Sequence, residues 1–291
     1  MKASQSGRLL LAGTIGVILT ACSGAGSQPP TQSLAVHKTS AFADTGSIAS
    51  TSTARSAQSL HCTAVATSKG PLTAAAVPTG KVDHANINAS GCDVGIYLGP
   101  SSNGQSIDHT TVTDANQYGI FADQAQNVAI DHTQVSRIGN HDGSGAFAPD
   151  GVQTGVGLYF RGASGSVDHT DLFQYQKNGT AFNCLFDAVS GACLKPSSVS
   201  MMHSTATGLG QVNYIAQNGI QYWDSTAPKF EQNTVTNNMY LNPADLIYNQ
   251  SATGYLFLCT NVASDQQLIK AHNAASNNDY NYFVDNNPAD C

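Results

Sequence analysis

The sequence predicts an all-β fold in which short strands stack on one another. A six-residue pattern, an aliphatic residue followed by Asp and His, recurs without gaps at 82–87, 107–112, 130–135 and 167–172, and degenerate copies follow at 201–206 and 230–235. A second pattern, led by glycine, stands between the copies at 95–98, 119–122, 157–160, 179–182 and 219–222. Short β-rich segments at such a period cannot each bury an apolar face alone, so neighbouring copies are expected to pack together.

The spacing of the copies indicates the size of one repeat unit. His84, His109 and His132 lie 25 and 23 residues apart, and the longer intervals that follow are interpreted as units that carry loop insertions. In such a stack the aliphatic residues face inward and meet their equivalents at a spacing of ~4.8 Å. The glycine that opens the second pattern is expected to permit a bend before that strand.

The repeat over roughly residues 80–240 resembles that of the parallel β-helices of pectate-lyase-like and NosD-like proteins. A leucine-rich repeat has a similar period, but its ladder of leucine and asparagine is not visible. The resemblance implies a single-stranded right-handed parallel β-helix, or solenoid, with disulfide-bonded caps at its two ends. The R-x-P-x-x-R segment of pectate lyases and the N-T-D, D-D, G-H-G and R-I-K signatures of polygalacturonases are absent, so the resemblance supports the fold more than either reaction.

The N-terminus has the features of an export signal. Lys2 and Arg8 flank the start of an apolar run at 9–19 that is too short for a mature membrane helix, so residues 1–21 are expected to be a signal peptide. The run ends in Leu-Thr-Ala-Cys, which resembles the lipobox of bacterial lipoproteins. This resemblance implies a lipid on Cys22 and attachment to the cell envelope, at the outer membrane or the cell surface. The alternative is an ordinary signal peptide with an incidental cysteine.

Composition then suggests the domain organisation. Residues 22–58 are rich in Ser, Thr and Ala and are expected to form a flexible tether, whereas 59–291 form one domain with repeats at about 80–240 and a C-terminal cap at 243–291. Removing the leader changes the formal net charge from −7 to −9, which argues against nucleic acid as a partner. A monomer that contacts the membrane only through its lipid is expected.

The cysteine count fits an exported protein. Six cysteines follow Cys22, and an even number in an oxidising compartment favours disulfides between the residues closest in sequence. The expected pairs are Cys62 with Cys92, Cys184 with Cys193, and Cys259 with Cys291. Free or metal-binding thiols are the alternative.

The Asp-His pairs are the first candidate site. In register they would form an acidic column of Asp83, Asp108, Asp131, Asp168 and Glu231, interrupted at Met202, beside a column of His84, His109, His132, His169 and His203. The metal-ligand candidates are Asp108, His109, Asp131, His132, Asp168 and His169. They would bind Ca²⁺, Zn²⁺ or Cu²⁺. The tetrad also resembles the W-I-D-H segment of pectate lyases, whose aspartate helps to bind calcium, so Ca²⁺ is the cofactor that the resemblance implies, although four copies are typical of a structural repeat. The alternatives are a pH-responsive surface and solvated turn residues copied by the repeat.

The second candidate site is the outward face of the glycine-led strands. Alternation places Tyr97, Phe121, Tyr159 and Gln221 outward, and Asp123, Arg161, Asn183 and Trp223 one step further. Aromatic rings beside polar groups suit sugar rings, so Tyr97, Phe121, Tyr159, Asn183, Trp223 and His141 are the substrate-binding candidates. The alternative is an aromatic ladder that only stabilises the sheet.

The insertion at 139–155 supplies candidate acids, because long loops on a rigid scaffold often carry function. Asp123, Asp142, Asp150 and Arg161 are the catalytic candidates, for glycoside hydrolysis or for β-elimination on an acidic sugar. A polar surface loop is the alternative. The sequence therefore predicts a cell-envelope lipoprotein that binds a polysaccharide, and it leaves open whether these residues also cleave it, as a lyase or a glycoside hydrolase would. A non-catalytic adhesion module and a metal-handling, NosD-like periplasmic protein are the alternatives.

Overall fold

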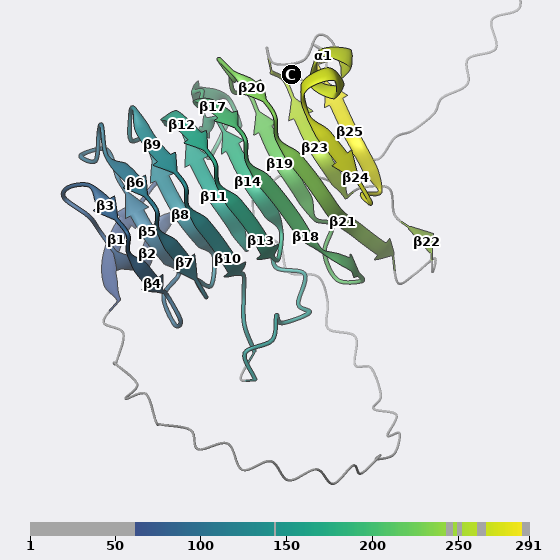
Figure 1. Cartoon of the computed structure of the whole chain (residues 1–291). Helices are drawn as coiled ribbons and strands as arrows, with labels where there is room; N and C mark the ends of the chain where they lie inside the picture. Colours follow the sequence, from purple (N-terminus) through teal and green to yellow (C-terminus); the bar gives the residue numbers. More distant parts are fainter. Residues whose placement is uncertain (1–61, 143, 243–246, 249–251, 261–265, 287–291) are drawn as a thin grey trace, which may run out of the picture. The chain divides into compact units, whose positions relative to one another are not determined.

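The folded part of the chain consists almost entirely of β-strands that lie side by side (Figure 1). The computed structural model describes residues 62–142, 144–242, 247–248, 252–260 and 266–286. The signal peptide, Cys22 and the tether expected at 22–58 lie outside these residues. Within the described part of the chain, no helix has the length and apolar character needed to cross a membrane.

Most strands belong to three sheets, which we number 1 to 3. Sheet 1 has the order β1 (Thr63–Thr67), β2 (Gly70–Ala76), β5 (Val94–Leu98), β8 (Tyr118–Asp123), β11 (Val156–Arg161), β14 (Asn178–Asn183), β19 (Asn218–Trp223), β23 (Thr253–Leu258) and β25 (Tyr280–Asp285). Sheet 2 has the order β4 (Asn86–Asn88), β7 (Thr111–Thr113), β10 (Gln134–Ile138), β13 (Asp171–Tyr175), β18 (Thr205–Val212), β21 (Thr234–Asn242) and β22 (Ile247–Tyr248), and β24 (Ala274–Ser276) also pairs with β21. Sheet 3 has the order β3 (Val82–Asp83), β6 (Ser106–Asp108), β9 (Val128–Asp131), β12 (Ser164–Asp168), β17 (Ser198–Met202) and β20 (Phe230–Glu231).

The chain visits the sheets in a fixed cycle. It runs through sheet 3, sheet 2 and sheet 1 in β3, β4 and β5, and repeats this cycle in β6, β7 and β8 and in the units that follow. Neighbouring units pair in parallel, and Ile107 is in register with Ile130, which is in register with Val167. The predicted alignment of the repeats is therefore confirmed, and the fold is all-β with parallel sheets.

The parallel sheets continue beyond the limit of about residue 240 that the repeats suggested. In the range expected to be a C-terminal cap, β23 and β25 extend sheet 1 and β24 extends sheet 2. The helix α1 (Gln266–His272) precedes β24 in the place that a sheet 3 strand takes in earlier units, and its Ile269 is buried in the core. The repeat signal was lost here because the Asp-His pair is absent.

The core consists of the inward residues of all three sheets. Ile96, Ile120 and Leu158 of sheet 1 are fully buried together with their counterparts in sheets 2 and 3, such as Val135 and Ile130. Each buried aliphatic side chain of this size stabilises the fold by about 1.5–3 kcal/mol relative to an exposed one.

The leading glycines of sheet 1 allow units to approach closely. A bend was the expected reason for these glycines, but a Cβ on Gly157 would lie 2.6 Å from the carbonyl oxygen of Gly179, and a Cβ on Gly119 would lie 2.6 Å from that of Gly157. Neither Gly119 nor Gly157 has a positive φ. These glycines are therefore required by the distance between neighbouring units.

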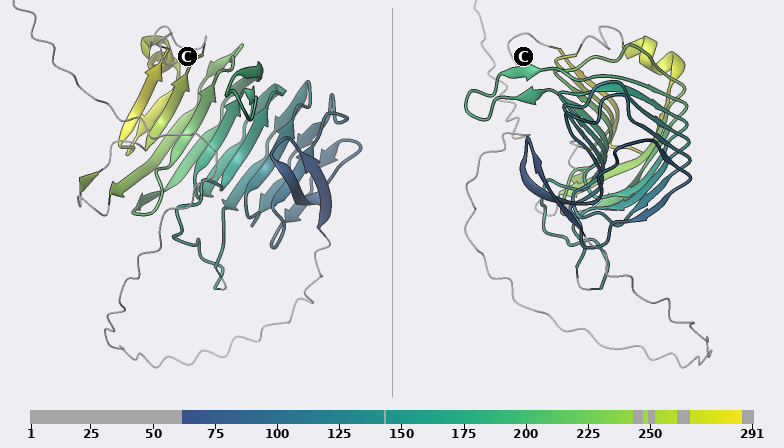
Figure 2. Two further views of the ribbon diagram at one scale, coloured as in Figure 1. Left: turned by 180° about the vertical axis from the view of Figure 1, so that it is seen from behind. Right: turned by 90° about the vertical axis from the view of Figure 1, so that its left-hand side faces the viewer.

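Two hairpins project from the repeats on the same side (Figure 2, right). The β1–β2 hairpin is antiparallel, joins sheet 1 through β2 and β5, and is tied down by a disulfide between Cys62 and Cys92. The second hairpin, β15 (Leu185–Phe186) and β16 (Cys193–Lys195), is closed by Cys184 and Cys193. Two predicted disulfides are thus confirmed. Cys259 is also disulfide-bonded, but its predicted partner Cys291 lies outside the described residues.

Candidate functional site

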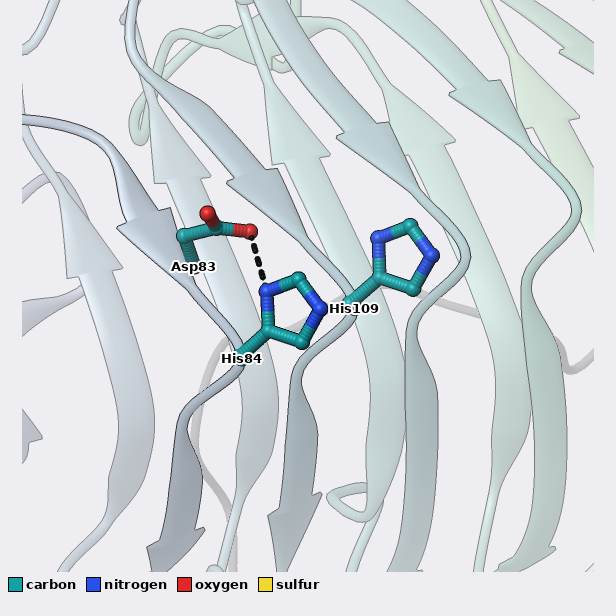
Figure 3. Close-up of side chains that lie close together, drawn as sticks. All are labelled: Asp83, His84 and His109. Atoms are coloured by element: carbon teal, nitrogen blue, oxygen red, sulfur yellow. Dashed lines mark hydrogen bonds and ion pairs between the residues drawn. The ribbon is translucent and has the colours of Figure 1, made fainter.

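The histidines of the repeats form a continuous stack at the turn between sheets 3 and 2. Successive rings from His84 to His203 have centroids 4.6–4.8 Å apart, and the first four are parallel within 3°. Figure 3 shows the first two rings with Asp83. Every one of these histidines has a φ of 42–49°, a left-handed conformation that histidine tolerates better than most residues. Identical backbone geometry in each unit therefore creates the stack.

Each histidine nitrogen Nδ1 lies against a carboxylate. The distance from Nδ1 to the Oδ1 of the preceding aspartate is 2.9 Å for His84, 2.7 Å for His109, 2.9 Å for His132 and 3.1 Å for His169. His203 follows Met202 instead of an aspartate, and its Nδ1 lies 2.8 Å from Asp168 of the neighbouring unit. Asp168 is therefore shared by two imidazoles. The predicted column of metal-ligand candidates is brought together, and His203 joins it.

The first end of the column carries a cation of its own. Lys81 Nζ lies 3.5 Å from Asp83 and 3.1 Å from Asp108. The hydrogen bond from Lys81 is the largest cause that lowers the pKa of the Asp108 carboxyl, and His109 adds to it. The carboxylates at this end thus have a counter-charge, whereas no lysine or arginine pairs with Asp168 within the described residues.

The donor atoms of the column do not fit Ca²⁺. Calcium takes six to eight oxygen ligands, whereas each group of possible ligands here combines one carboxylate with two imidazoles. The second carboxylate oxygen of Asp108 is already bound by Lys81. Imidazole nitrogen is a ligand that Zn²⁺, Cu²⁺ and Ni²⁺ prefer, so this column suits transition metals.

The predicted aromatic platform is buried. Phe121 is 0% exposed, and Tyr97 and Tyr159 are each 7% exposed. The rings face away from the main core, as alternation predicted, but they form a second apolar cluster beneath Val65 and Leu72 of the β1–β2 hairpin. The prediction that these rings are exposed to a ligand is therefore wrong, because the N-terminal hairpin covers this part of sheet 1.

The same hairpin holds the predicted acid Asp123. Asp123 is 1% exposed and accepts hydrogen bonds from the N–H and the hydroxyl of Ser68. Tyr97 donates a hydrogen bond to the carbonyl of Ala66, and its pKa is raised to about 12, first by burial and then by the charge of Asp123. No pattern in the sequence indicates this contact, although Ser-Lys-Gly at 68–70 is typical of a turn.

The insertion at 139–155 does not reach Asp123. It enters β11 at Val156, whereas Asp123 is in register with Arg161 at the other end of that strand. Asp142 accepts hydrogen bonds from the N–H and hydroxyl of Ser144, which are the main causes that lower its pKa, and Asp150 accepts one from Asn140. The four predicted catalytic residues therefore do not form one site. Asp123 and Arg161 lie at the C-terminal ends of their strands in sheet 1, whereas Asp142 and Asp150 lie in the loop that precedes the N-terminal end of β11.

His141 lies in the same insertion, apart from the other substrate-binding candidates. Its ring stacks on Phe147 with centroids 4.9 Å apart. Burial is the main cause that lowers the pKa of His141, and the charge of Arg137 adds to this effect. A half-buried imidazole that stacks on an aromatic ring is typical of a residue that keeps a loop folded.

Arg161 lies between the turn of the β1–β2 hairpin and strand β15 of the second hairpin. Its Nη1 and Nη2 donate hydrogen bonds of 3.4 Å to the main-chain oxygens of Ser68 and Phe186, and its Nε is buried without a partner among the described residues. Asn183 and Trp223 follow it in register along the end of sheet 1. The Trp223 ring lies 5.0 Å from that of Phe186. We call Arg161, Asn183, Phe186, Lys195 and Trp223 the sheet 1 rim.

Lys195 contributes a second cation to the rim. Its Nζ lies 3.4 Å from the main-chain oxygen of Gln124, one residue beyond Asp123. Phe186 and Lys195 were missed in the sequence because they belong to the disulfide-closed hairpin and not to the repeat.

No family model, curated protein or solved structure matches the chain.

Proposed function

We propose that this protein is an exported right-handed parallel β-helix, anchored to the cell envelope through a lipid on Cys22, that binds polysaccharides bearing carboxylate groups. The three-sheet cycle and the parallel register of its units support the β-helix. The disulfides of Cys62 with Cys92 and Cys184 with Cys193 support an oxidising compartment outside the cytoplasm.

The binding site that we propose is the sheet 1 rim, and the environment of Arg161 carries this proposal. Arg161 forms no ion pair with a carboxylate within the described residues, although Asp123 stands beside it in register, because Asp123 is bound by Ser68. Its contacts are long hydrogen bonds to two main-chain oxygens. A guanidinium that has no carboxylate partner and only long hydrogen bonds to main-chain oxygens can bind a ligand carboxylate through two parallel hydrogen bonds.

The other rim residues supply what a sugar chain requires. The rings of Trp223 and Phe186 offer apolar faces for C–H groups, and Lys195 adds a second positive charge. Asn183 already accepts a hydrogen bond from Gln221, which fixes its side-chain orientation. We propose binding without cleavage at this site, because Asp142 and Asp150 lie at the other end of β11 and Asp123 is buried.

Calorimetric titration of the lipid-free protein tests this proposal. Polygalacturonate and alginate are compared with a neutral polysaccharide such as dextran. We expect binding of an acidic chain only, weakened at least tenfold by Arg161→Gln and by Trp223→Ala and reduced by added salt. Arg137→Gln is the matched control, because Arg137 forms an ion pair with Asp114 away from the rim. Equal binding of dextran, or unchanged affinity in both rim variants, would exclude the rim as an acidic-glycan site.

A further inference from the structure

We propose that Asp168, His169 and His203 form a binding site for a divalent transition metal ion such as Zn²⁺ or Cu²⁺. This site lies at the turn between sheets 3 and 2, and its function is separate from glycan binding at the sheet 1 rim. The three side chains offer two imidazole nitrogens and one carboxylate oxygen, which is a typical set of ligands for such ions.

The spacing of the three donor atoms suits a single ion. Asp168 Oδ1 lies 3.1 Å from the Nδ1 of His169 and 2.8 Å from the Nδ1 of His203. In a tetrahedral site with bonds of ~2.1 Å, neighbouring ligand atoms are about 3.4 Å apart. Two of the three separations are therefore close to this value. The two imidazole nitrogens lie within 4.8 Å of each other, so the rings have to tilt towards one another for all three atoms to surround one ion, with the fourth position open to water.

The other units of the column offer a poorer geometry. Asp131 Oδ1 lies 2.9 Å from His132, but its distance to the next histidine, His169, is 3.9 Å. The rings from His84 to His169 are parallel within 3°, whereas the planes of His169 and His203 differ by 13°. The last pair therefore departs from the regular stack at the carboxylate that both rings share.

The break in the repeat at Met202 explains why the site forms here. In the earlier units each histidine follows its own aspartate, so one carboxylate serves one ring. Met202 leaves His203 without this neighbour, and the ring turns its Nδ1 to Asp168. The main-chain N–H of His169 also donates a hydrogen bond to Asp168 Oδ1, which fixes the carboxylate between the two rings.

The site is accessible and negatively charged. The side chains of Asp168, His169 and His203 are 31%, 47% and 36% exposed, so an ion can reach them from solvent. No lysine or arginine forms an ion pair with Asp168 within the described residues, whereas Lys81 occupies the carboxylates at the other end of the column.

Titration with metal salts tests this inference. Lipid-free protein stripped with EDTA is titrated calorimetrically with ZnCl₂, CuCl₂ and CaCl₂. We expect one tight site for Zn²⁺ or Cu²⁺, at least tenfold weaker Ca²⁺ binding, and signals from two nitrogen ligands in the electron paramagnetic resonance spectrum of bound Cu²⁺. His203→Ala and Asp168→Asn should each weaken this site at least tenfold.

His84→Ala is the matched control, because His84 belongs to the same stack but lies at its other end. The affinity of this variant for Zn²⁺ or Cu²⁺ should equal that of the unmodified protein. Circular dichroism verifies that each variant is folded. Equal losses in His84→Ala and His203→Ala, or no tight site for either ion in the unmodified protein, would overturn the inference. Glycan binding by His203→Ala, measured on the same sample, reports separately on the rim.

Discussion

The N–H and the hydroxyl of Ser68 both donate hydrogen bonds to the carboxylate of Asp123, at 2.6 and 2.5 Å. Ser68 is the tip of the β1–β2 hairpin, and Asp123 is the last residue of β8. This contact fixes the hairpin across the aromatic cluster of sheet 1. It also gives the buried carboxylate two hydrogen-bond donors, so Asp123 has a role in stabilising the fold.

Replacing Ser68 by Ala should destabilise the domain by about 1–3 kcal/mol, because the buried Asp123 loses one of its donors. Ser144→Ala is the matched control, since the Ser144 hydroxyl donates a similar hydrogen bond of 2.6 Å to the exposed carboxylate of Asp142. That change should cost less than about 0.5 kcal/mol. Urea unfolding measures both values, and equal effects would show that the hairpin tip is not anchored through Ser68.

Gly157→Ala should destabilise the domain by about 2–3 kcal/mol, because the new methyl group would lie against the carbonyl oxygen of Gly179 and push two units apart. Gly80→Ala introduces the same methyl group where nothing lies within 4 Å and φ is not positive. Its effect should stay within about 1 kcal/mol. Thermal unfolding of the two variants compares them, and similar midpoints would contradict the close approach of the units.

Removal of the Cys184–Cys193 disulfide should loosen the β15–β16 hairpin without unfolding the sheets. Trp223 is the only tryptophan of the chain and packs on Phe186 of this hairpin, so its emission should shift to longer wavelength in the double alanine variant. The Cys62→Ala and Cys92→Ala pair should instead lower stability by about 2–4 kcal/mol and leave the emission of the folded state unchanged. An emission shift in the second variant alone would refute this assignment of the two disulfides.

Tyr97→Phe should change how stability depends on alkaline pH. The pKa of Tyr97 is about 12 in the folded protein and about 10 in an unfolded chain. A raised pKa means that the contribution of this group is fully present below pH 10 and is lost as the pH rises towards 12.

The variant loses the hydrogen bond to Ala66, which costs about 0.5–1.5 kcal/mol at neutral pH. The free energy of unfolding of the variant should then fall less steeply between pH 10 and 12 than that of the unmodified protein. The difference between the two slopes should be up to about 1.4 kcal/mol per pH unit. Urea unfolding at several alkaline pH values measures the two slopes. Identical slopes would show that Tyr97 does not titrate with this shift.

The repeat and its register could be predicted because they depend on local pattern. Asp108, Asp131 and Asp168 align in the sequence, and the same residues are partners in sheet 3. Nearest-neighbour pairing of cysteines was also sufficient for two disulfides, since each closes a short segment. These features need no knowledge of distant contacts.

The cover over sheet 1 could not be predicted in the same way. The segment at 63–76 is rich in alanine and threonine, and nothing in it indicates that it folds over strands tens of residues further along the chain. The burial of Phe121 follows from that distant contact. By contrast, the separation of Asp142 from Asp123 was foreseeable, because the insertion enters β11 at its first residue while Arg161 is its last.

The shared carboxylate of Asp168 could be predicted only in part. The absence of an aspartate at Met202 was visible in the sequence, and it marks the place where the column changes. The turn of His203 towards the preceding unit depends on side-chain geometry, which the repeat pattern does not contain.

The close approach of the leading glycines of sheet 1 to carbonyl oxygens of the next unit, which leaves no room for a Cβ, restricts how this protein can change its length. A duplicated unit has to bring a glycine to the same position, or the new unit cannot pair with its neighbours along all three sheets. Loops at the corners carry no such restriction, because lengthening them leaves the distance between units unchanged. Evolution and engineering alike can therefore add chain at the corners far more easily than they can add turns to the stack.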